Sequence, residues 1–515
     1  MAGKYLCGVD NGTTGTKAMI FDLQGNVVGS AYREYKCEYP KPGWVDQDAE
    51  LLFSELCAAI KTAITSAGID PRDIASVGLS TQRCTMVPVD ENCRPLRYAI
   101  SWQDRRCTDE CDWTRDNIGA ERYYEITGLP IDTTWALPAI LWIRNNEPEI
   151  YEKTFKFLLT QEFILHRLGA ESYPEDWSNG SLQGLMDIEN FTWSKELLET
   201  TGIPEDKLPE LVPSAQMVGR VSKEAAELTG LAEGTPLVTG GGDQQCAGVG
   251  AGVIKTGLCE VTLGTAGVSL CFMDKPMKDP TMRMPCSAHA VPGKWECEGL
   301  QMAAGASLRW YRDNFAELEL LLGKKVSIDP YEFINMQVEK VPAGSKGLLF
   351  LPHLAGAGAP NWNPYAKGVF FGLTLAHERA AMARAIMEGI TMETREILEA
   401  FEGLGLSLTE VRITGGATKS ALWNQIQADI YGKPVSRLAV GEATVLGAAI
   451  LGGVGARVFA SIDEAVDRMV GVTQRYEPNM ANHKTYNELF EIYKEVYRSL
   501  AVGNAYKMLT EIVTR

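Results

Sequence analysis

The stretch Val9-Asp10-Asn11-Gly12-Thr13-Thr14-Gly15 follows a short apolar strand, and part of it recurs later in the chain. Residues 9–22 align without gaps with the segment that begins Val261-Thr262-Leu263-Gly264-Thr265-Ala266-Gly267 and ends at Asp274, and five of fourteen positions are identical. The two segments lie 252 residues apart in a chain of 515 residues. A duplicated strand-turn-strand unit, one copy in each half, is the simplest explanation.

A strand that runs into Gly-Thr-x-Gly brings small residues into a tight turn, where backbone N–H groups and threonine hydroxyls approach an anion closely. Two such turns suit a polyphosphate, although each turn alone is equally well explained as an ordinary hairpin turn. The sequence has no Gly-x-x-x-x-Gly-Lys-Ser/Thr loop and no Gly-x-Gly-x-x-Gly after a strand. P-loop and Rossmann sites therefore lose their main support.

Two aspartates stand at strand ends near these turns. Asp10 directly precedes the first turn, and Asp243 ends the glycine turn 240–243 that follows the strand 237–239. Acids in such places are suited to holding Mg²⁺ or to acting as a general base. The alternative is that each caps the backbone of its own turn.

Apolar runs separated by turn residues predict a mixed α/β protein. The expected strands span 5–9, 18–22, 26–29, 74–79, 237–239 and 411–414. The expected helices span 48–67, where Asp48 caps the start and Gly68 the end, 382–398, and 479–515. The last helix is amphipathic and either packs on one of the domains or forms a homodimer contact.

Length and composition bound the class of protein. At roughly 100–200 residues per domain, 515 residues predict two or more domains. The net charge of −17 argues against nucleic acid and anionic membrane surfaces as partners. Twelve cysteines are too sparse for a disulfide scaffold, the N-terminus lacks an apolar signal core, and the longest uncharged run, 347–366, contains several prolines. We expect a cytoplasmic protein with reduced thiols and no membrane span.

Taken together, the motifs resemble the FGGY carbohydrate kinases of the actin/hexokinase/Hsp70 superfamily, from about residue 5 to about residue 457. Each motif alone is weakly specific, whereas the ordered set is strongly specific. The motifs are Asp10-Asn11-Gly12-Thr13-Thr14-Gly15-Thr16-Lys17, Trp102-Gln103-Asp104-Arg105-Arg106, Gly240-Gly241-Gly242-Asp243-Gln244, Leu263-Gly264-Thr265-Ala266-Gly267, the segments 356–362 and 367–373, and Thr414-Gly415-Gly416-Ala417.

The resemblance implies an α/β fold of two ribonuclease-H-like domains, as in actin-like ATPases, which flank a catalytic cleft. Residues 1–245 would hold the sugar site, the first phosphate loop and the catalytic aspartate, and residues 246–515 the second phosphate loop, the adenosine site and the C-terminal helices. It also implies ATP and Mg²⁺ as cofactors. Asp243 would be the catalytic base, and Asp10 and Asp243 would organise the metal.

The same resemblance assigns the binding residues. The implied substrate residues are Gln82, Arg83, Trp102, Asp104, Asp243 and Gln244. The implied nucleotide residues are Gly12, Thr13, Thr14, Lys17, Gly264, Thr265, Gly267, Arg309, Gly415, Gly416, Ala417 and Ser420. An arginine and carboxylates match vicinal hydroxyls because each bridges two of them with charge-assisted hydrogen bonds.

The function implied by the resemblance is phosphorylation, by ATP, of a hydroxyl group of a small sugar or polyol. Trp-x-Asp-x-Arg at 102–106 agrees with the xylulose kinases, which favours a pentulose such as xylulose, although that branch usually carries Gln-Met-His where this chain has 82–84. Residues 81–85 resemble glycerol kinases, with Cys84 in place of a glutamate. Residues 423–430 and 442–444 resemble kinases of the autoinducer-2 precursor. That precursor, erythritol and a glycerol-type polyol remain alternatives.

Two other classes of function use fewer of these residues. An actin- or Hsp70-like ATPase that acts on a protein partner explains the phosphate turns but not Arg83, Trp102 and Asp104. An inactive sensor of sugar or nucleotide has no need for both Asp10 and Asp243. The kinase interpretation accounts for all of them.

Overall fold

The computed structural model describes residues 3–513, which form two compact units. Unit 1 comprises residues 3–255, 272–297 and 442–471, and unit 2 comprises residues 256–271, 298–441 and 472–513. Each unit contains its own sheet with helices, which confirms the expected α/β class. The domain boundary that the sequence predicts between residues 245 and 246 stays a prediction.

The sheet of unit 1 has six strands in the order β13-β14-β5-β1-β2-β3. Strands β1, β5 and β14 run parallel, whereas β2 and β3 form an antiparallel extension. Their bounds are β1 Tyr5–Asn11, β2 Gly15–Asp22, β3 Val27–Glu34, β5 Ile74–Thr81, β13 Met217–Arg220 and β14 Pro236–Gly242. The strands expected in these regions are therefore present, and each is longer than predicted.

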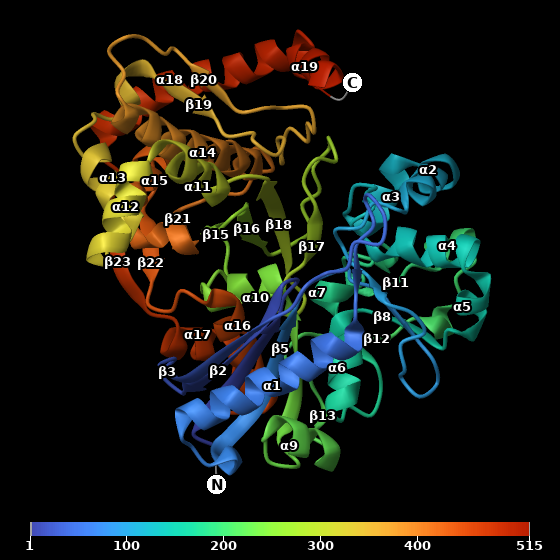
Figure 1. The fold of residues 1–515 in the computed structure, drawn as a ribbon. Helices are drawn as coiled ribbons and strands as arrows, with labels where there is room; N and C mark the ends of the chain where they lie inside the picture. The colour runs from blue at the N-terminus through green and yellow to red at the C-terminus, as the bar shows by residue number, and fades with distance from the viewer. Residues whose placement is uncertain (1–2, 514–515) are drawn as a thin grey trace. The chain divides into compact units, whose positions relative to one another are not determined.

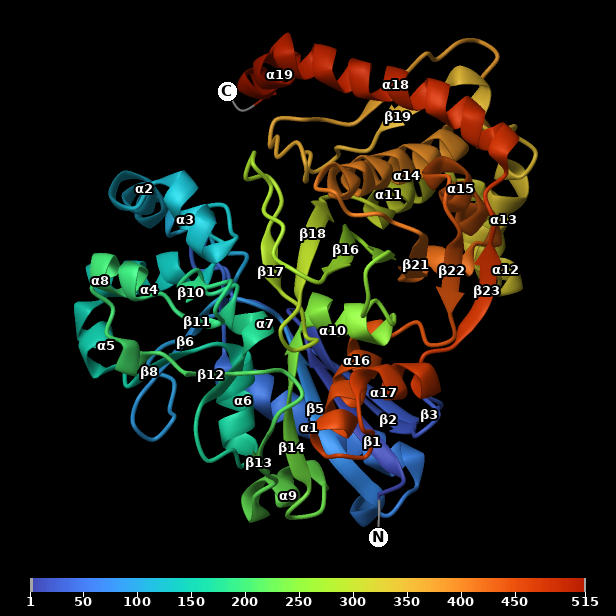
Figure 2. The same cartoon turned by 180° about the vertical axis from the view of Figure 1, so that it is seen from behind.

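Two long helices cover the faces of this sheet. Helix α1, Ala49–Ala67, packs on β2 and β3, and its ends are as predicted: the Asp48 side chain accepts from the Glu50 and Leu51 N–H groups, and Gly68 has φ 63°. Helix α16, Ala443–Gly455, packs on β1, β5 and β14. Figure 1 shows α1 in front of the sheet, and Figure 2, from behind, shows α16 in front of it.

The remaining elements of unit 1 are short helices, strand pairs and 3₁₀ turns around this sheet. They are β4 Asp46–Gln47, η1 Pro71–Asp73, β6 Val87–Val89, β7 Ala99–Ile100, α2 Thr108–Asn117, α3 Ala120–Thr127, α4 Ala136–Asn146, α5 Pro148–Lys153, β8 Lys156–Leu158, α6 Thr160–Leu168, β9 Pro174–Asp176, α7 Trp177–Gly180, β10 Met186–Asp187, β11 Thr192–Trp193, α8 Lys195–Thr201, η2 Glu205–Lys207, β12 Glu210–Val212, α9 Lys223–Thr229, α10 Asp243–Gly250, β17 Cys286–Ala288 and α17 Ile462–Met469. Strand β18, Trp295–Gln301, begins in unit 1 and ends in unit 2.

Unit 2 is built on neighbouring strands in the order β16-β15-β21-β22-β23. Its elements are β15 Leu258–Leu263, β16 Gly267–Met273, which ends in unit 1, α11 Gly305–Phe315, α12 Glu317–Val326, α13 Pro330–Val338, η3 Ser345–Gly347, β19 Leu349–Leu351, β20 Val369–Phe371, α14 Arg379–Gly403, β21 Glu410–Thr414, η4 Gly416–Lys419, α15 Ala421–Tyr431, β22 Val435–Leu438, β23 Val472–Tyr476, α18 Met480–Val502 and α19 Ala505–Val513. Helix α14 covers the expected 382–398 and is longer at both ends.

The two repeated segments both fold as antiparallel hairpins, but their turns differ in length. Val9 pairs with Ala18 in the first hairpin, whereas Val261 pairs with Ser269 in the second. The second turn is therefore one residue shorter. The gapless alignment of the sequences holds up to the turn and slips by one residue after it.

The C-terminal region is two helices rather than the single helix expected over 479–515. Helices α18 and α19 are separated by residues 503–504, where Asn504 has φ 56°. Tyr486, Phe490 and Tyr493 of α18 are buried within unit 2, where the helix packs on α15 and β19. The apolar face of α18 is thus covered by its own chain. Residues 514–515 lie outside the described residues.

All twelve cysteines are buried and carry free thiols. Burial alone raises the pKa of Cys7 to about 12, and similar environments raise the pKa of Cys57 and Cys111 to about 12. A buried thiol with a raised pKa is a poor nucleophile. The cysteines therefore act as small core side chains.

Helix α16 lies unusually close to its neighbours because small residues line the contact. A Cβ atom on Gly78 would lie 1.9 Å from the Ala448 carbonyl oxygen, and one on Gly447 would lie 1.8 Å from the Cys246 carbonyl oxygen. Neither glycine has a positive φ, so space alone excludes a side chain there. Residues 442–455 are thereby held against β5 and α10 by direct backbone packing.

We expect Gly447→Ala to lower the free energy of unfolding by about 1–3 kcal/mol or more, because the new methyl group forces α16 away from α10. Gly403→Ala is the matched control, since a Cβ atom there meets nothing within 4 Å. Urea unfolding followed by circular dichroism measures both variants. Equal stability of the two variants would contradict the role given to this packing.

Candidate active site

The two predicted acids meet at one edge of the unit 1 sheet. Strands β1 and β14 both run parallel to β5, which lies between them. Asp10 is the penultimate residue of β1 and Asp243 is the first residue of α10, directly after β14. The carboxyl ends of parallel strands are where α/β proteins bind ligands. The strand order places both carboxylates at such an edge.

Asp10 is a half-buried carboxyl group in an electrostatically unfavourable place. The Ser80 hydroxyl donates to Asp10 Oδ1 at 2.9 Å. Burial, followed by the charge of Asp243, raises the pKa of Asp10 to about 7, although Ser80 and the cation of Lys17 act to lower it. The negative charge of each carboxylate makes ionisation of the other less favourable. A cation bound at this place would relieve the repulsion.

Asp243 is held from two sides. Arg83 Nε forms an ion pair with Asp243 Oδ1 at 3.0 Å, and the Gln244 N–H donates to the same oxygen at 2.8 Å. A Cβ atom on Gly242 would lie 2.7 Å from Arg83 Cδ and 2.5 Å from Gln245 Oε1. Glycine at 242 therefore lets the arginine reach the aspartate, and the predicted catalytic and substrate residues Asp243 and Arg83 are in contact.

Buried amide groups at this edge lack partners. Gln82 follows β5 and is 1% exposed, and neither atom of its amide has a hydrogen-bond partner among residues 3–513. The side-chain oxygen of Gln244 and both amide atoms of Gln245 share this condition. Because buried polar groups are nearly always paired, this edge suits a ligand with several hydroxyl groups. Gln245 is absent from the sequence prediction, and its position two residues after Asp243 was the available signal.

The first predicted phosphate turn is braced by side chains from distant segments. The Tyr35 hydroxyl donates to the Gly12 carbonyl at 2.6 Å, and Gln47 Nε2 donates to the Thr13 carbonyl at 2.9 Å. Trp102 Nε1 donates to Thr13 Oγ1 at 2.9 Å. A predicted sugar residue, Trp102, thus contacts a predicted nucleotide residue. Tyr35 and Gln47 carry no sequence signal of their role.

Lys17 forms an ion pair that the sequence does not predict. It stands opposite Asp10 in the β1–β2 pairing, and its Nζ lies 2.5 Å from Glu442 Oε1. Glu442 directly precedes α16, and its charge contributes to raising the pKa of Asp10. The partner of the lysine comes from 425 residues further along the chain. Only the close packing of α16 on the sheet brings the two together.

The Asp104 carboxylate is bound by groups of its own chain. Asp104 is 1% exposed, its Oδ2 accepts from the Val45 N–H at 2.6 Å, and its carboxylate takes three hydrogen bonds from Arg106. Arg106 also pairs with Asp46. The carboxylate is thus bound by its own chain, and the direct sugar contact expected of Asp104 stays a prediction. The carboxylate fixes the turn that carries Trp102.

In unit 2 the second phosphate turn lies against the start of α11. The Gly305 N–H donates to the Gly264 carbonyl at 2.8 Å, and the Ala306 N–H donates to the Thr265 carbonyl at 3.1 Å. Arg309 Nη2 lies 3.5 Å from Thr265 Oγ1. A Cβ atom on Gly267 would lie 2.4 Å from Gln301 Oε1. Arg309 therefore adjoins the second phosphate turn, and its implied place beside the adenosine stays a prediction.

The predicted adenosine turn leaves the neighbouring strand. Thr262 of β15 and Thr414 of β21 are opposite each other, so the two turns of unit 2 begin side by side. Gly415 has φ 82°, and a Cβ atom there would lie 2.7 Å from the Leu263 carbonyl. Gly416 faces open space. Ala417 forms part of the turn η4, which precedes α15. The Ser420 hydroxyl caps α15 by accepting from the Trp423 N–H at 3.2 Å.

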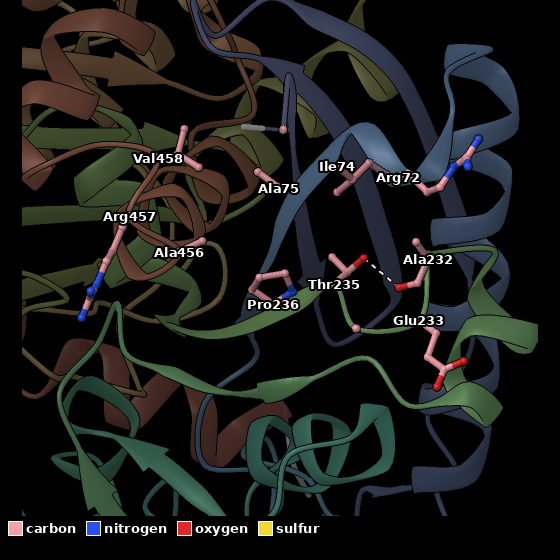
Figure 3. A pocket seen from close by; sticks show the side chains of 12 residues that line it. Arg72, Ile74, Ala75, Ala232, Glu233, Thr235, Pro236, Ala456, Arg457 and Val458 are labelled. Atoms are coloured by element: carbon pink, nitrogen blue, oxygen red, sulfur yellow. Dashed lines mark hydrogen bonds between the residues drawn. The ribbon is translucent and has the colours of Figure 1, made fainter. Parts of the chain in front are cut away.

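A cavity of about 480 Å³ lies at the opposite end of the unit 1 sheet. Ile74 and Pro236, which begin β5 and β14, are in its wall. Figure 3 shows that the side chains of Arg72, Glu233 and Arg457 extend away from its middle. This cavity contains none of the predicted site residues and offers no converging charged groups, so we do not assign the site there.

Buried acids support the strand that leads to Asp243. The Gly242 N–H donates to Ser178 Oγ at 3.0 Å, and Ser178 donates in turn to Asp176. Glu162 and Glu175 are also completely buried nearby. Burial raises the pKa of Glu162 to about 8, and burial together with the charge of Glu162 raises the pKa of Glu175. These carboxyl groups therefore keep protons that they would release in water at neutral pH.

We expect the free energy of unfolding to fall as the pH rises from about 5 to about 8, because the folded protein retains a proton on Glu162 that the unfolded chain releases above its ordinary pKa of 4.5. Glu162→Gln should flatten this dependence while its amide oxygen still accepts from the Leu159 N–H. Urea unfolding at several pH values measures the slope. The exposed Glu149→Gln serves as control, and an unchanged slope in Glu162→Gln would refute the assignment.

Among the described residues no helix combines the length and apolarity needed to cross a bilayer.

No group of three or more histidine, cysteine or acidic side chains within residues 3–513 could hold a metal ion. Mg²⁺, however, is usually bound by only one or two carboxylates, with water and phosphate oxygens completing its shell. The pair Asp10 and Asp243 fits that requirement in number and in chemistry.

Comparison with known proteins identifies relatives along the whole chain. The profile described as "FGGY family of carbohydrate kinases, N-terminal domain" matches residues 5–250, and the one for the C-terminal domain matches residues 259–456. Gluconokinase from Bacillus subtilis is 34% identical, over 96% of both chains. Glycerol kinase from Thermococcus gammatolerans is 33% identical, over 96% of this chain and 97% of its own.

The solved structures agree with these matches. The crystal structure of ligand-bound xylulose kinase from Lactobacillus acidophilus has a TM-score of 0.88 and 26% sequence identity, and the match covers 96% of this chain and 98% of that one. The relatives thus carry three different substrate names. The comparisons converge on one kind of reaction and leave its acceptor open.

Proposed function

The chain belongs to the FGGY family of carbohydrate kinases, and on this premise we propose that its acceptor is a small neutral sugar, a pentulose such as xylulose. The enzyme is a phosphotransferase with an alcohol group as acceptor and ATP as co-substrate, as in its kinase relatives. The observation that carries the proposal is the contact of Asp243 with Arg83 at the strand edge where Asp10 and the unpaired amide of Gln82 also lie.

In the proposed reaction Asp243 accepts the proton of a sugar hydroxyl while that oxygen bonds to the γ-phosphorus of ATP. The bond between the γ-phosphorus and the bridging oxygen breaks, and ADP leaves with the electron pair. Arg83 holds Asp243 in place through the 3.0 Å ion pair, and its guanidinium group is suited to bridging vicinal sugar hydroxyls. Such catalysis depends chiefly on alignment and electrostatics.

Mg²⁺ is proposed at Asp10 and Asp243, whose mutual repulsion contributes to the raised pKa of Asp10. When bound, the ion would neutralise charge on the transferring phosphate oxygens. The backbone N–H groups of the turns, with Thr13, Thr14 and Lys17 in unit 1, are proposed to bind the phosphates. In unit 2 the proposed nucleotide residues are Gly264, Thr265, Gly267, Arg309, Gly415, Gly416, Ala417 and Ser420.

The charge of the site favours a neutral acceptor over an anionic one. Arg83 at the strand edge is already paired with Asp243, and Asp10 adds a further carboxyl group. Gluconate, the substrate named by one relative, would bring another carboxylate to this place. Cys84, where glycerol kinases carry a glutamate, is buried and donates to the Leu182 carbonyl at 3.4 Å, so it offers no acceptor for glycerol.

We expect xylulose or another pentulose to give a kcat/KM at least about tenfold above those of gluconate and glycerol, a difference of about 1.4 kcal/mol in transition-state binding. A coupled ADP-release assay over pentuloses, pentitols, erythritol, glycerol, gluconate and the autoinducer-2 precursor measures this. A preference for gluconate would refute the electrostatic argument. ADP release that needs no added sugar would instead favour an ATPase.

We expect Asp243→Asn to lower kcat by about 10²–10⁴-fold, because the amide cannot accept the hydroxyl proton, and to lower nucleotide affinity far less, because Asp10 and the phosphate turns remain. Steady-state kinetics and titration with a non-hydrolysable ATP analogue separate the two effects. Asp90→Asn is the matched control, because Asp90 is partly exposed and its side chain accepts from the Asn92 and Arg94 N–H groups of its own turn. Retention of most activity in Asp243→Asn would remove this residue from the role of base.

A further inference from the structure

The hydrogen bond between Trp102 and Thr13 joins two residues that the proposed function assigns to different substrates. Trp102 belongs to the sugar side and Thr13 to the turn that would bind the nucleotide phosphates. Trp102 Nε1 lies 2.9 Å from Thr13 Oγ1, and the two residues are 89 positions apart in the sequence. Both side chains are half-buried, so water competes only partly for this contact.

The chemistry of the two groups fixes the direction of this bond. An indole N–H only donates, whereas a threonine hydroxyl has one hydrogen and two acceptor lone pairs. Thr13 Oγ1 therefore accepts from Trp102, and its own hydrogen must point elsewhere. No acceptor for that hydrogen is found within residues 3–513. The hydroxyl is thus left as a donor on a turn whose other donors are backbone N–H groups, which suits an anion.

The tryptophan is itself held by a buried ionic brace. Trp102 and Asp104 share a turn in which the Asp104 N–H donates to the Ser101 carbonyl at 2.9 Å. The Asp104 carboxylate binds the Val45 N–H and Arg106, and Arg106 stacks on the ring of Trp44 at 4.0 Å. Arg106 and Asp104 are both almost completely buried. The turn carrying the indole is therefore fixed before any ligand binds.

The strand pair β4–β7 contacts the same phosphate turn through a second hydrogen bond. Strand β4 pairs with β7, and Gln47 of β4 donates to the Thr13 carbonyl at 2.9 Å. The Ser101 N–H, which follows β7, donates to the Val45 carbonyl at 3.0 Å. Thr13 is thus bound through its carbonyl by Gln47 of β4 and through its hydroxyl by Trp102, in the turn that follows β7. A free surface threonine would have neither contact.

We infer that Trp102 is a positioning residue for the nucleotide: by occupying a lone pair of the Thr13 hydroxyl, its indole N–H directs the Thr13 hydrogen toward a phosphate oxygen. The inference rests on the proposed function in taking the turn at 12–14 as a phosphate site. It differs from the role implied by the family resemblance, in which Trp102 serves the sugar. It also gives Asp104 a purpose that its burial allows.

A double-mutant cycle tests the inference without any sugar. The full-length wild type, Trp102→Phe, Thr13→Val and the double variant are titrated with the Mg²⁺ complex of a non-hydrolysable ATP analogue. Trp102→Phe keeps an aromatic ring and loses the N–H donor together with part of the indole. We expect each single variant to bind about two- to tenfold more weakly, the usual loss for one hydrogen bond, and the double variant to bind no more weakly than Thr13→Val.

The control is Trp295→Phe, because the Trp295 indole is also half-buried in unit 1 but donates to the Ile188 carbonyl at 2.7 Å. Its nucleotide affinity should equal that of the wild type, and thermal unfolding should show that all variants are folded. Unchanged affinity in either single variant, or losses that multiply in the double variant, would overturn the inference. A wild type that phosphorylates no tested sugar would refute only the proposed function, since the cycle contains no acceptor.

Discussion

The close packing of α16 on the central strands is the constraint on which unit 1 depends. Gly8, Gly78 and Gly250 each face a backbone carbonyl of this helix at a distance that no Cβ atom could occupy. Because α16 begins at residue 443, a segment from the second half of the sequence completes the face of a sheet made by the first half. Interiors packed to this density tolerate little change in volume.

This packing also reaches the chemistry. Glu442 precedes α16 and meets Lys17, whose strand partner is Asp10, and α10 begins with Asp243 and contacts α16 along its length. The position of one helix therefore affects how Asp10, Asp243 and Lys17 are arranged. Burial at this place, followed by the charge of Asp243, raises the pKa of Asp10 to about 7. Perturbed carboxyl groups of this kind are characteristic of functional sites.

Local signals in the sequence predicted much of the fold. The caps of α1, Asp48 and Gly68, were predictable because capping and left-handed backbone geometry depend on a few neighbouring residues. The hairpin repeat was visible because glycine and threonine in a tight turn have few substitutes. The break between α18 and α19 was not predicted, since Asn504 adopts φ 56° without glycine or proline to mark it. The packing of α16, from the second half of the sequence, on the sheet of unit 1 depends on long-range contacts, which have no local signature in the sequence.

The sequence by itself determined the family, the two turns, the acids Asp10 and Asp243, and the segment with Arg83 that follows β5. Each of these depends on a short motif whose residue types are required by its chemistry. Only the tertiary structure decided which side chains serve those motifs. Asp104 belongs to the same motif as Trp102, yet its carboxylate is buried against Arg106, while Trp102 reaches Thr13. Hydrogen bonds across 89 residues follow from the folded path of the chain, and no spacing in the sequence encodes them.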